Sequence, residues 1–252
     1  MKKRILNLLT VVSIVFLSGS VGCDPEPVVI EPVPTTIPMK ILMNYKNTPL
    51  IVNKNYALDD STKVRFSRIN FFLTNISAGT ITGQESKTES MYFDFSNLTD
   101  SAKAANGVSQ NLEVSKGTTY DRIIFTVGVS TLLNARKPAS FPLASALSNT
   151  DEYWSSWNSF IFVKLEGALD KNNDGIFESP FTLHTGGNDV AKEKAFLETI
   201  SGDNAKGVKM ALKMEDILGG VSLRSVSSAH GVDQLPLMKT ITSNIANGLR
   251  FE

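Results

Sequence analysis

The sequence predicts a mainly β protein: a single β-sandwich domain with a few short helices and a C-terminal helix, preceded by a signal peptide and a proline-rich stalk. Three observations support this fold class. Short apolar runs rich in β-branched and aromatic residues recur along the chain, as at residues 120–129. Residues 90–95 alternate apolar and polar side chains, as a half-buried strand does. Turn-rich connections separate these runs, and no second linker divides the 252-residue chain.

The N-terminus has the parts of an export signal. Basic residues at positions 2–4 precede an apolar stretch at residues 5–17, and small residues then lead to Cys23. This only cysteine resembles the lipidated cysteine of a bacterial lipoprotein. We therefore expect a signal peptide over residues 1–22, lipidation at Cys23, and an exported protein anchored to a membrane of the cell envelope, at the outer membrane or cell surface. An ordinary signal peptide with an incidental cysteine is the alternative.

Residues 23–38 form the predicted linker between the lipid and the domain. Five of the ten prolines lie here, which excludes a helix and favours an extended polyproline segment. Asp24 and Glu26, close behind the cysteine, resemble the surface-export signals of Bacteroidota lipoproteins. The folded domain is then expected over residues 39–252.

Composition and motifs exclude several function classes. Without the signal peptide the chain has 22 basic and 25 acidic residues, so no basic field predicts a nucleic-acid partner. The sequence has no Gly-x-Ser-x-Gly elbow, no His-Glu-x-x-His motif and no phosphate-binding loop. We therefore predict that the protein is not an enzyme.

Periodicity and capping residues predict the elements of the domain. Strands are expected at residues 39–45, 64–76, 90–95, 120–129, 160–165, 180–184 and 207–214. Helices are expected at residues 98–106, 143–147, 214–218 and 234–249, and residues 190–200 are expected to form a helix or an irregular lid.

Residues 151–187 form the segment with the most chemistry in the chain. Both tryptophans, Trp154 and Trp157, and one of the two histidines, His184, lie in it. A turn with Gly175 between two apolar runs predicts a hairpin, because glycine takes positive φ without steric cost. The aromatic pair therefore enters one end of the hairpin, and the histidine leaves it.

The turn of this hairpin is acidic. Asp170, Asn172 and Asp174 alternate as the first oxygen ligands of an EF-hand calcium loop do, with Gly175 at the sixth position. Glu178 stands at the ninth position, and the glutamate usual at the twelfth is missing. The segment is interpreted either as a calcium site outside an EF-hand or as a polar hairpin turn.

Several motifs follow one another in a specific order. They are Arg-Ile-Asn-Phe-Phe-Leu-Thr-Asn-Ile at 68–76, Ile-Phe-Thr-Val-Gly-Val-Ser at 124–130, Tyr-Trp-Ser-Ser-Trp-Asn-Ser at 153–159, Phe-Val-Lys-Leu-Glu-Gly at 162–167, Phe-Thr-Leu-His-Thr-Gly-Gly at 181–187, and His230 followed by Leu-Pro-Leu-Met-Lys-Thr-Ile at 235–241. In this order they resemble the MbnP-like family of methanobactin-associated copper-binding proteins, over about residues 39–252. The chain departs from the family pattern in having one more residue between its tryptophans, no glycine before Phe160, and only two histidines.

The resemblance implies a secreted or lipid-anchored β-sandwich that binds or handles copper. His184 and His230 match the family motifs and are the expected copper ligands. Trp157, with Trp154 as the second candidate, is the expected target of oxidation to kynurenine. The partner implied for that oxidation is a dihaem cytochrome c peroxidase.

Residue chemistry agrees with a copper site but leaves alternatives open. Imidazole suits copper in either oxidation state, and a thioether suits Cu(I); the methionines considered are Met210, Met214 and Met238. Otherwise the histidines are a strand-end and a loop residue, and the tryptophans pack in the core or at a sheet edge. The contrasting hypothesis is a metal-independent or calcium-stabilised surface module that binds a protein or a glycan. A copper site requires both histidines close in space, whereas the surface module requires both tryptophans exposed on one patch.

Overall fold

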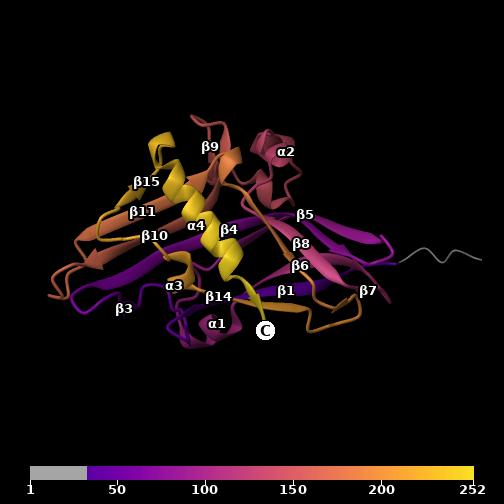
Figure 1. Cartoon of the computed structure of the whole chain (residues 1–252), viewed down its shortest axis with the longest axis horizontal. Coiled ribbons are helices and arrows are strands. Elements are labelled where there is room, and N and C mark those ends of the chain that lie inside the picture. The colour runs from indigo at the N-terminus through magenta and orange to yellow at the C-terminus, as the bar shows by residue number, and fades with distance from the viewer. Residues whose placement is uncertain (1–32) are drawn as a thin grey trace, which may run out of the picture. The chain divides into compact units, whose positions relative to one another are not determined.

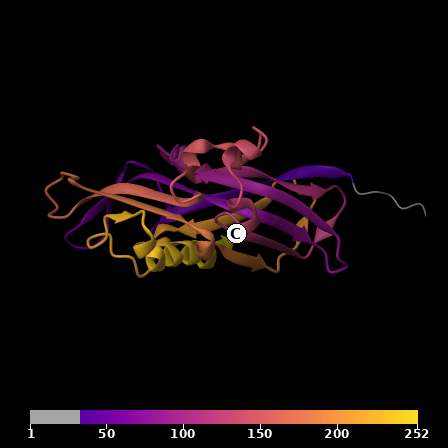
Figure 2. The ribbon, with the colours of Figure 1, turned by 90° about the horizontal axis from the view of Figure 1, so that it is seen from above.

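The computed structural model describes residues 33–252, except for the side chain of Val232 (Figures 1 and 2). The predicted signal peptide, Cys23 and the linker up to residue 32 lie outside the described residues. Within residues 33–252, no helix is long and apolar enough to cross a membrane.

The larger of two main sheets has nine strands in the order β12–β8–β4–β10–β11–β15, with β3 and β5 also paired with β4, and β9 with β10. The strands are β3 (Asn55–Ala57), β4 (Lys63–Gly79), β5 (Glu85–Asp94), β8 (Arg122–Val127), β9 (Tyr153–Trp154), β10 (Ser159–Asp170), β11 (Ser179–Gly186), β12 (Lys192–Phe196) and β15 (Ser228–Ala229). The predicted hairpin is confirmed as β10 and β11, which pair antiparallel.

The smaller sheet has five strands in the order β16–β14–β1–β2, with β6 also paired with β1. They are β1 (Pro34–Tyr45), β2 (Thr48–Pro49), β6 (Val108–Ser115), β14 (Val208–Lys213) and β16 (Arg250–Phe251), and a further two-stranded ribbon joins β7 (Thr119–Tyr120) to β13 (Ile200–Ser201). One hydrophobic core contains side chains from both main sheets. The predicted mainly β sandwich is therefore confirmed.

β4 is the scaffold of the larger sheet because it is long enough, at 17 residues, to pair with several strands. Its first half lies beside β10 and its second half beside β8, while β5 follows its other edge. Phe66, Phe71 and Phe72 on β4 are fully buried. Packed aromatic side chains of this kind explain why phenylalanine is so frequent in the sequence.

Short helices and one longer helix cover the sheets. They are α1 (Ser101–Asn106), α2 (Thr131–Asn134), α3 (Met214–Ile217) and α4 (Leu235–Gly248), with 3₁₀ turns η1 (Pro138–Ser140), η2 (Ala146–Ser148), η3 (Thr150–Glu152), η4 (Asn188–Val190) and η5 (Val232–Gln234). Asp100 caps α1 by accepting the Lys103 N–H at 2.9 Å. The helix predicted at residues 234–249 is confirmed as α4, which buries an apolar stripe that includes Met238, Ile241 and Ile245. Figure 2 shows α2 and α4 on opposite sides of the sheets.

Two element predictions were wrong or imprecise. Residues 190–200 form neither a helix nor an irregular lid, because Lys192–Phe196 pairs with β8 as strand β12. The Phe196 ring packs 6.0 Å from Phe125 and 4.9 Å from Phe251 between ring centroids, so tertiary packing overrides a weak helix propensity. The short helix expected at residues 143–147 is reduced to the 3₁₀ turn at Ala146–Ser148.

β1 begins at Pro34, five residues before the predicted start of the domain at Met39. Residues 34–38 pair with β6, whereas β14 pairs with β1 only from Met39 onward. Prolines 34 and 38 therefore lie where β1 has a neighbour on one side alone, which is where a strand tolerates a missing N–H. Part of the expected linker thus belongs to the sandwich.

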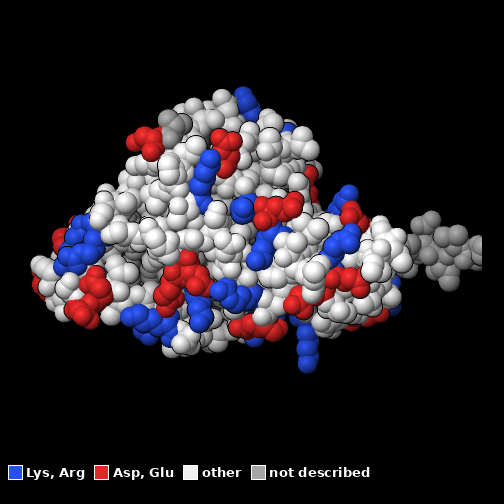
Figure 3. All heavy atoms as spheres, viewed as in Figure 1, with Lys and Arg blue, Asp and Glu red and all other residues white. Residues whose placement is uncertain are grey.

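Charged side chains are interspersed on the surface. Figure 3 shows lysine and arginine mixed with aspartate and glutamate, without a field of one sign on the face in view. This distribution matches the balanced composition of 25 basic and 25 acidic residues.

Removal of residues 33–38 should lower the stability of the domain. A fragment that begins at Met39 loses five paired residues of β1 and the burial of Ile37, which is 3% exposed. Since full burial of an isoleucine contributes about 1.5–3 kcal/mol, the free energy of unfolding in urea should fall by at least about that amount relative to residues 33–252. Ile37→Ala in the longer fragment is the control for the side chain alone. Equal stability of the two fragments would contradict the placement of residues 34–38 in the fold.

Candidate functional site

The two histidines, 46 positions apart in the sequence, are brought together by a short parallel strand pair. β15 lies beside β11 with Thr182 opposite Ser228 and Leu183 opposite Ala229. The residue that follows each of these pairs is a histidine: His184 follows Leu183, and His230 follows Ala229. The ring centroids of the two histidines are 4.6 Å apart at an interplanar angle of 67°. The two imidazole rings therefore lie close together in space.

His184 is a buried imidazole with one nitrogen engaged and one free. Its Nε2 lies 2.7 Å from Oε1 of Glu166 on β10, and its side chain is 11% exposed. Because a carboxylate only accepts hydrogen bonds, Nε2 carries the proton and Nδ1 carries a lone pair. Nδ1 is buried and has no hydrogen-bond partner among the described residues. An unsatisfied buried acceptor of this kind is unusual and indicates a place for a ligand.

The surroundings keep this imidazole neutral. Burial is the largest cause that lowers the pKa of His184 from 6.5 to about 4, with smaller contributions from His230 and Lys164, while the Glu166 carboxylate raises it. At neutral pH the ring is therefore uncharged, which is the form that binds metals.

His230 completes the pair from the surface side. Its Nδ1 shares a hydrogen bond of 2.8 Å with Oγ of Ser228, and its backbone N–H donates to Oε1 of Gln234 at 2.7 Å. In the described part of the chain, no hydrogen bond occupies its Nε2. The ring is exposed, so the site opens to solvent on this side.

Trp154 lies beside both histidines, and Trp157 lies beside Trp154. β9 pairs with the start of β10, and residues 155–158 form the loop between them. The ring centroids of Trp154 and Trp157 are 4.7 Å apart. The Trp154 ring is 6.0 Å from each histidine ring. The longer spacing between the tryptophans thus fits a four-residue hairpin loop in which Asn158 has a φ of 49°.

Gly186 makes room for the indole. A Cβ atom at Gly186 would stand 3.2 Å from Cζ3 of Trp154 and 2.8 Å from the Phe160 carbonyl oxygen. The glycine that follows His184-Thr185 therefore lets Trp154 approach the histidine strand. Both tryptophans are half-buried, which does not match the exposed aromatic patch that a surface module requires.

The methionines considered as soft ligands are core residues. Met210 on β14, Met214 at the start of α3 and Met238 on α4 are all fully buried in the hydrophobic cluster. They pack there with apolar neighbours from both sheets, so their burial is explained without a metal.

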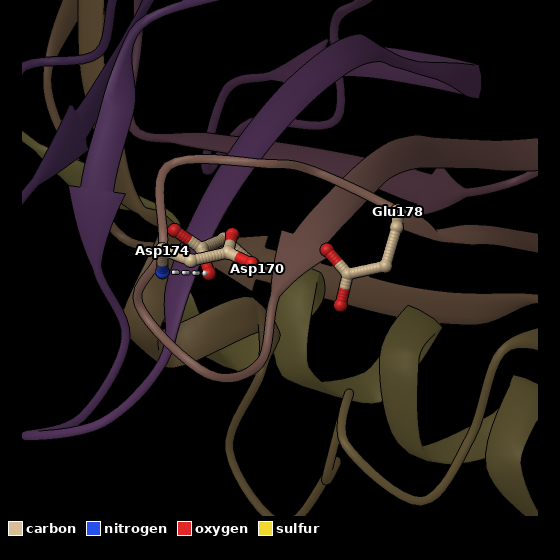
Figure 4. Close-up of side chains that lie close together, drawn as sticks. All are labelled: Asp170, Asp174 and Glu178. Carbon is tan, nitrogen blue, oxygen red and sulfur yellow. Dashed lines mark hydrogen bonds between the residues drawn. The ribbon is translucent and has the colours of Figure 1, made fainter.

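The acidic turn between β10 and β11 gathers three of its four predicted ligands (Figure 4). Asp170, Asp174 and Glu178 each have an oxygen within 4.8 Å of the others. The buried Asp170 carboxylate accepts the N–H groups of Asp174 at 3.1 Å and Gly175 at 2.9 Å. The Asn172 side chain donates to Asp174 at 2.9 Å. These bonds account for Asp170, Asn172 and Asp174 as polar residues that stabilise the turn, and the calcium site stays a prediction.

A family model named MbnP matches residues 34–233 of the chain. The chain belongs to the MbnP family. The matched residues begin at the first residue of β1, include both tryptophans and both histidines, and end before α4. Membership in the MbnP family confirms the resemblance found in the sequence.

Other comparisons add little to the MbnP assignment. Among solved structures, the chain is similar to MbnP from Methylosinus trichosporium, with 11% sequence identity, coverage of 79% of this chain and 81% of that chain, and a TM-score of 0.48. No curated protein matches the chain.

Two charged residues of the MbnP-like Lys-Leu-Glu-Gly motif belong to the site, although the sequence analysis assigned them no role. Lys164 lies opposite His184 in the β10–β11 ladder, and Glu166 follows two residues later on the same face. The signal that would have found them is their alternation with the core residues Val163 and Leu165. A charged residue within such a buried strand needs a partner.

His184 should make the domain less stable as the pH falls. Its pKa is about 4 in the folded protein against an ordinary 6.5, so between these values the unfolded chain binds a proton that the folded chain does not. The free energy of unfolding is therefore not reduced by His184 above pH 6.5. It falls progressively as the pH drops toward 4, by about 3 kcal/mol in total. Urea denaturation across this range should show a steeper loss for the wild type than for His184→Gln. Parallel curves for the two proteins would contradict the buried neutral imidazole.

Proposed function

We propose that this MbnP-family protein binds copper through His184 and His230. The observation that carries the proposal is the buried, unpartnered Nδ1 of His184 beside a second imidazole, with 4.6 Å between the ring centroids. Imidazole nitrogen is a good ligand for copper in either oxidation state. The ion is the cargo of the site, and binding or handling it is the proposed role.

The residues around the pair fit a bound ion. Glu166 accepts the hydrogen bond of the Nε2–H group of His184, so Nδ1 keeps its lone pair free to bind a metal ion. A carboxylate that accepts from the second nitrogen of a metal-binding imidazole fixes the tautomer and the ring orientation. Trp154 covers the pair on one side and limits access of water, while the exposed His230 leaves an entry path.

The proposal includes the cell envelope as the place of action. Export, lipidation of Cys23 and anchoring in a membrane are supported by the N-terminal sequence pattern. A dihaem cytochrome c peroxidase is the proposed partner, with Trp157 or Trp154 as its oxidation target. The position of Trp154 supports this extension, since its half-buried ring lies 6.0 Å from each histidine ring and the Trp157 ring lies beside it.

Copper loading tests the site. After incubation with copper and desalting, residues 33–252 should retain about one copper per chain, because two imidazoles provide one soft-to-borderline site. His184→Ala and His230→Ala should each lose it, as measured by elemental mass spectrometry. Asp174→Asn, in the acidic turn, is the matched control and should load like the wild type. Copper retained equally in all four proteins, or in none, would reject the histidine site.

Glu166→Gln should weaken copper binding without unfolding the domain. Glutamine has the shape of glutamate but can present either its oxygen or its amide to His184, so the tautomer is no longer fixed. Loss of such an outer carboxylate typically costs about 10–100-fold in metal affinity, measured by competition with a chelator. Glu178→Gln, in the acidic turn, serves as the control. An unchanged affinity in Glu166→Gln would remove Glu166 from the site.

A further inference from the structure

A buried ion pair lies beside the histidine site. Lys164 on β10 is opposite His184 on one side and Asn70 of β4 on the other. Its Nζ is 2.9 Å from Oε2 of Glu152, and the two residues are 4% and 1% exposed. Oε2 has no partner with hydrogen-bond geometry, so the contact is an ion pair and not an aligned hydrogen bond.

The pair ties one short segment to the sheet. Glu152 ends the turn η3 and stands two residues before Trp154. Nζ of Lys164 also donates to the backbone carbonyl of Asp151 at 2.9 Å. Tyr92 on β5 donates its hydroxyl to Oε1 of Glu152 at 2.8 Å, and burial together with the Glu152 charge raises the pKa of Tyr92. The chain is therefore held by two strands directly before it reaches the indole.

Stability alone does not explain a buried ion pair. The desolvation of two charges opposes their attraction, and apolar replacements of similar volume are often as stable or more stable. The pair fixes the position of the backbone at residues 151–152, because the Lys164 ammonium contacts both the Glu152 side chain and the Asp151 carbonyl group. The position of this backbone determines where β9 begins, because β9 follows η3 directly.

We propose that Lys164 and Glu152 are positioning residues that hold Trp154 against His184 and His230. Trp154 is the residue whose ring lies 6.0 Å from both histidine rings, and its backbone follows the tethered segment directly. The significance of this position for copper rests on the proposed function, whereas the position itself does not depend on copper.

The test uses nuclear Overhauser effects (NOEs) between Trp154 and the two histidine rings in copper-free protein. The double variant Lys164→Met/Glu152→Gln leaves no unpaired buried charge and keeps an acceptor for Tyr92. We expect these NOEs in the wild type and their loss in the folded double variant. Arg68→Met is the matched control: its guanidinium lies 4.0 Å from both Glu152 and Glu166 and hydrogen-bonds to neither, so the NOEs between Trp154 and the histidines should persist in this variant.

The outcomes separate this inference from the proposed function. NOEs that persist in the folded double variant overturn the positioning role, whatever the protein does with copper. NOEs lost in the double variant and kept in Arg68→Met support it, even if the wild type binds no copper. If the double variant does not fold, Lys164→Met alone is measured in the same way, since it removes both contacts of the ammonium and leaves Glu152 the hydrogen bond from Tyr92. Retained NOEs there overturn the proposal, and lost NOEs support it.

Discussion

The parallel pairing of β15 with β11 is the contact on which the site depends. β15 has only two residues, and its position is fixed from both ends: the Thr182 N–H donates to the Ser227 carbonyl oxygen at 2.8 Å, and Gln234 accepts the His230 N–H at 2.7 Å. Gln234 directly precedes α4, whose buried face packs on β11. The C-terminal helix thus stabilises the segment that delivers the second histidine.

The two faces of the larger sheet have different roles around the β10–β11 hairpin: one packs in the core and the other carries the polar residues of the site. Side chains such as Leu165 and Leu183 turn toward the core and supply the hydrophobic stabilisation of the sandwich. The alternate residues of the same strands, Lys164, Glu166 and His184, form a polar row that is buried in part. Low solvent access strengthens the electrostatic contacts within this row. The same burial leaves Nδ1 of His184 without a hydrogen-bond partner among the described residues, which makes the row suitable for a ligand.

Local patterns predicted much of the fold, and long-range register explains what they missed. The β10–β11 hairpin and the stripe of α4 follow from turn chemistry and periodicity in contiguous residues. The approach of His184 to His230 depends on the register of a two-residue strand, which has no periodic signal. Residues 192–196 misled because their helix propensity is weaker than the pairing offered by β8. The ion pair between Lys164 and Glu152 could not be predicted for the same reason, since Glu152 lies outside the strand that contains Lys164 and the contact depends on the tertiary fold.

The central claim is that copper is held between the two imidazoles, and its position is measured most directly by anomalous diffraction. Crystals of copper-loaded residues 33–252, recorded at the copper absorption edge, should show one strong peak bonded to Nδ1 of His184 and to a nitrogen of His230. A peak at the acidic turn or beside a core methionine, with none at the histidines, would contradict the account.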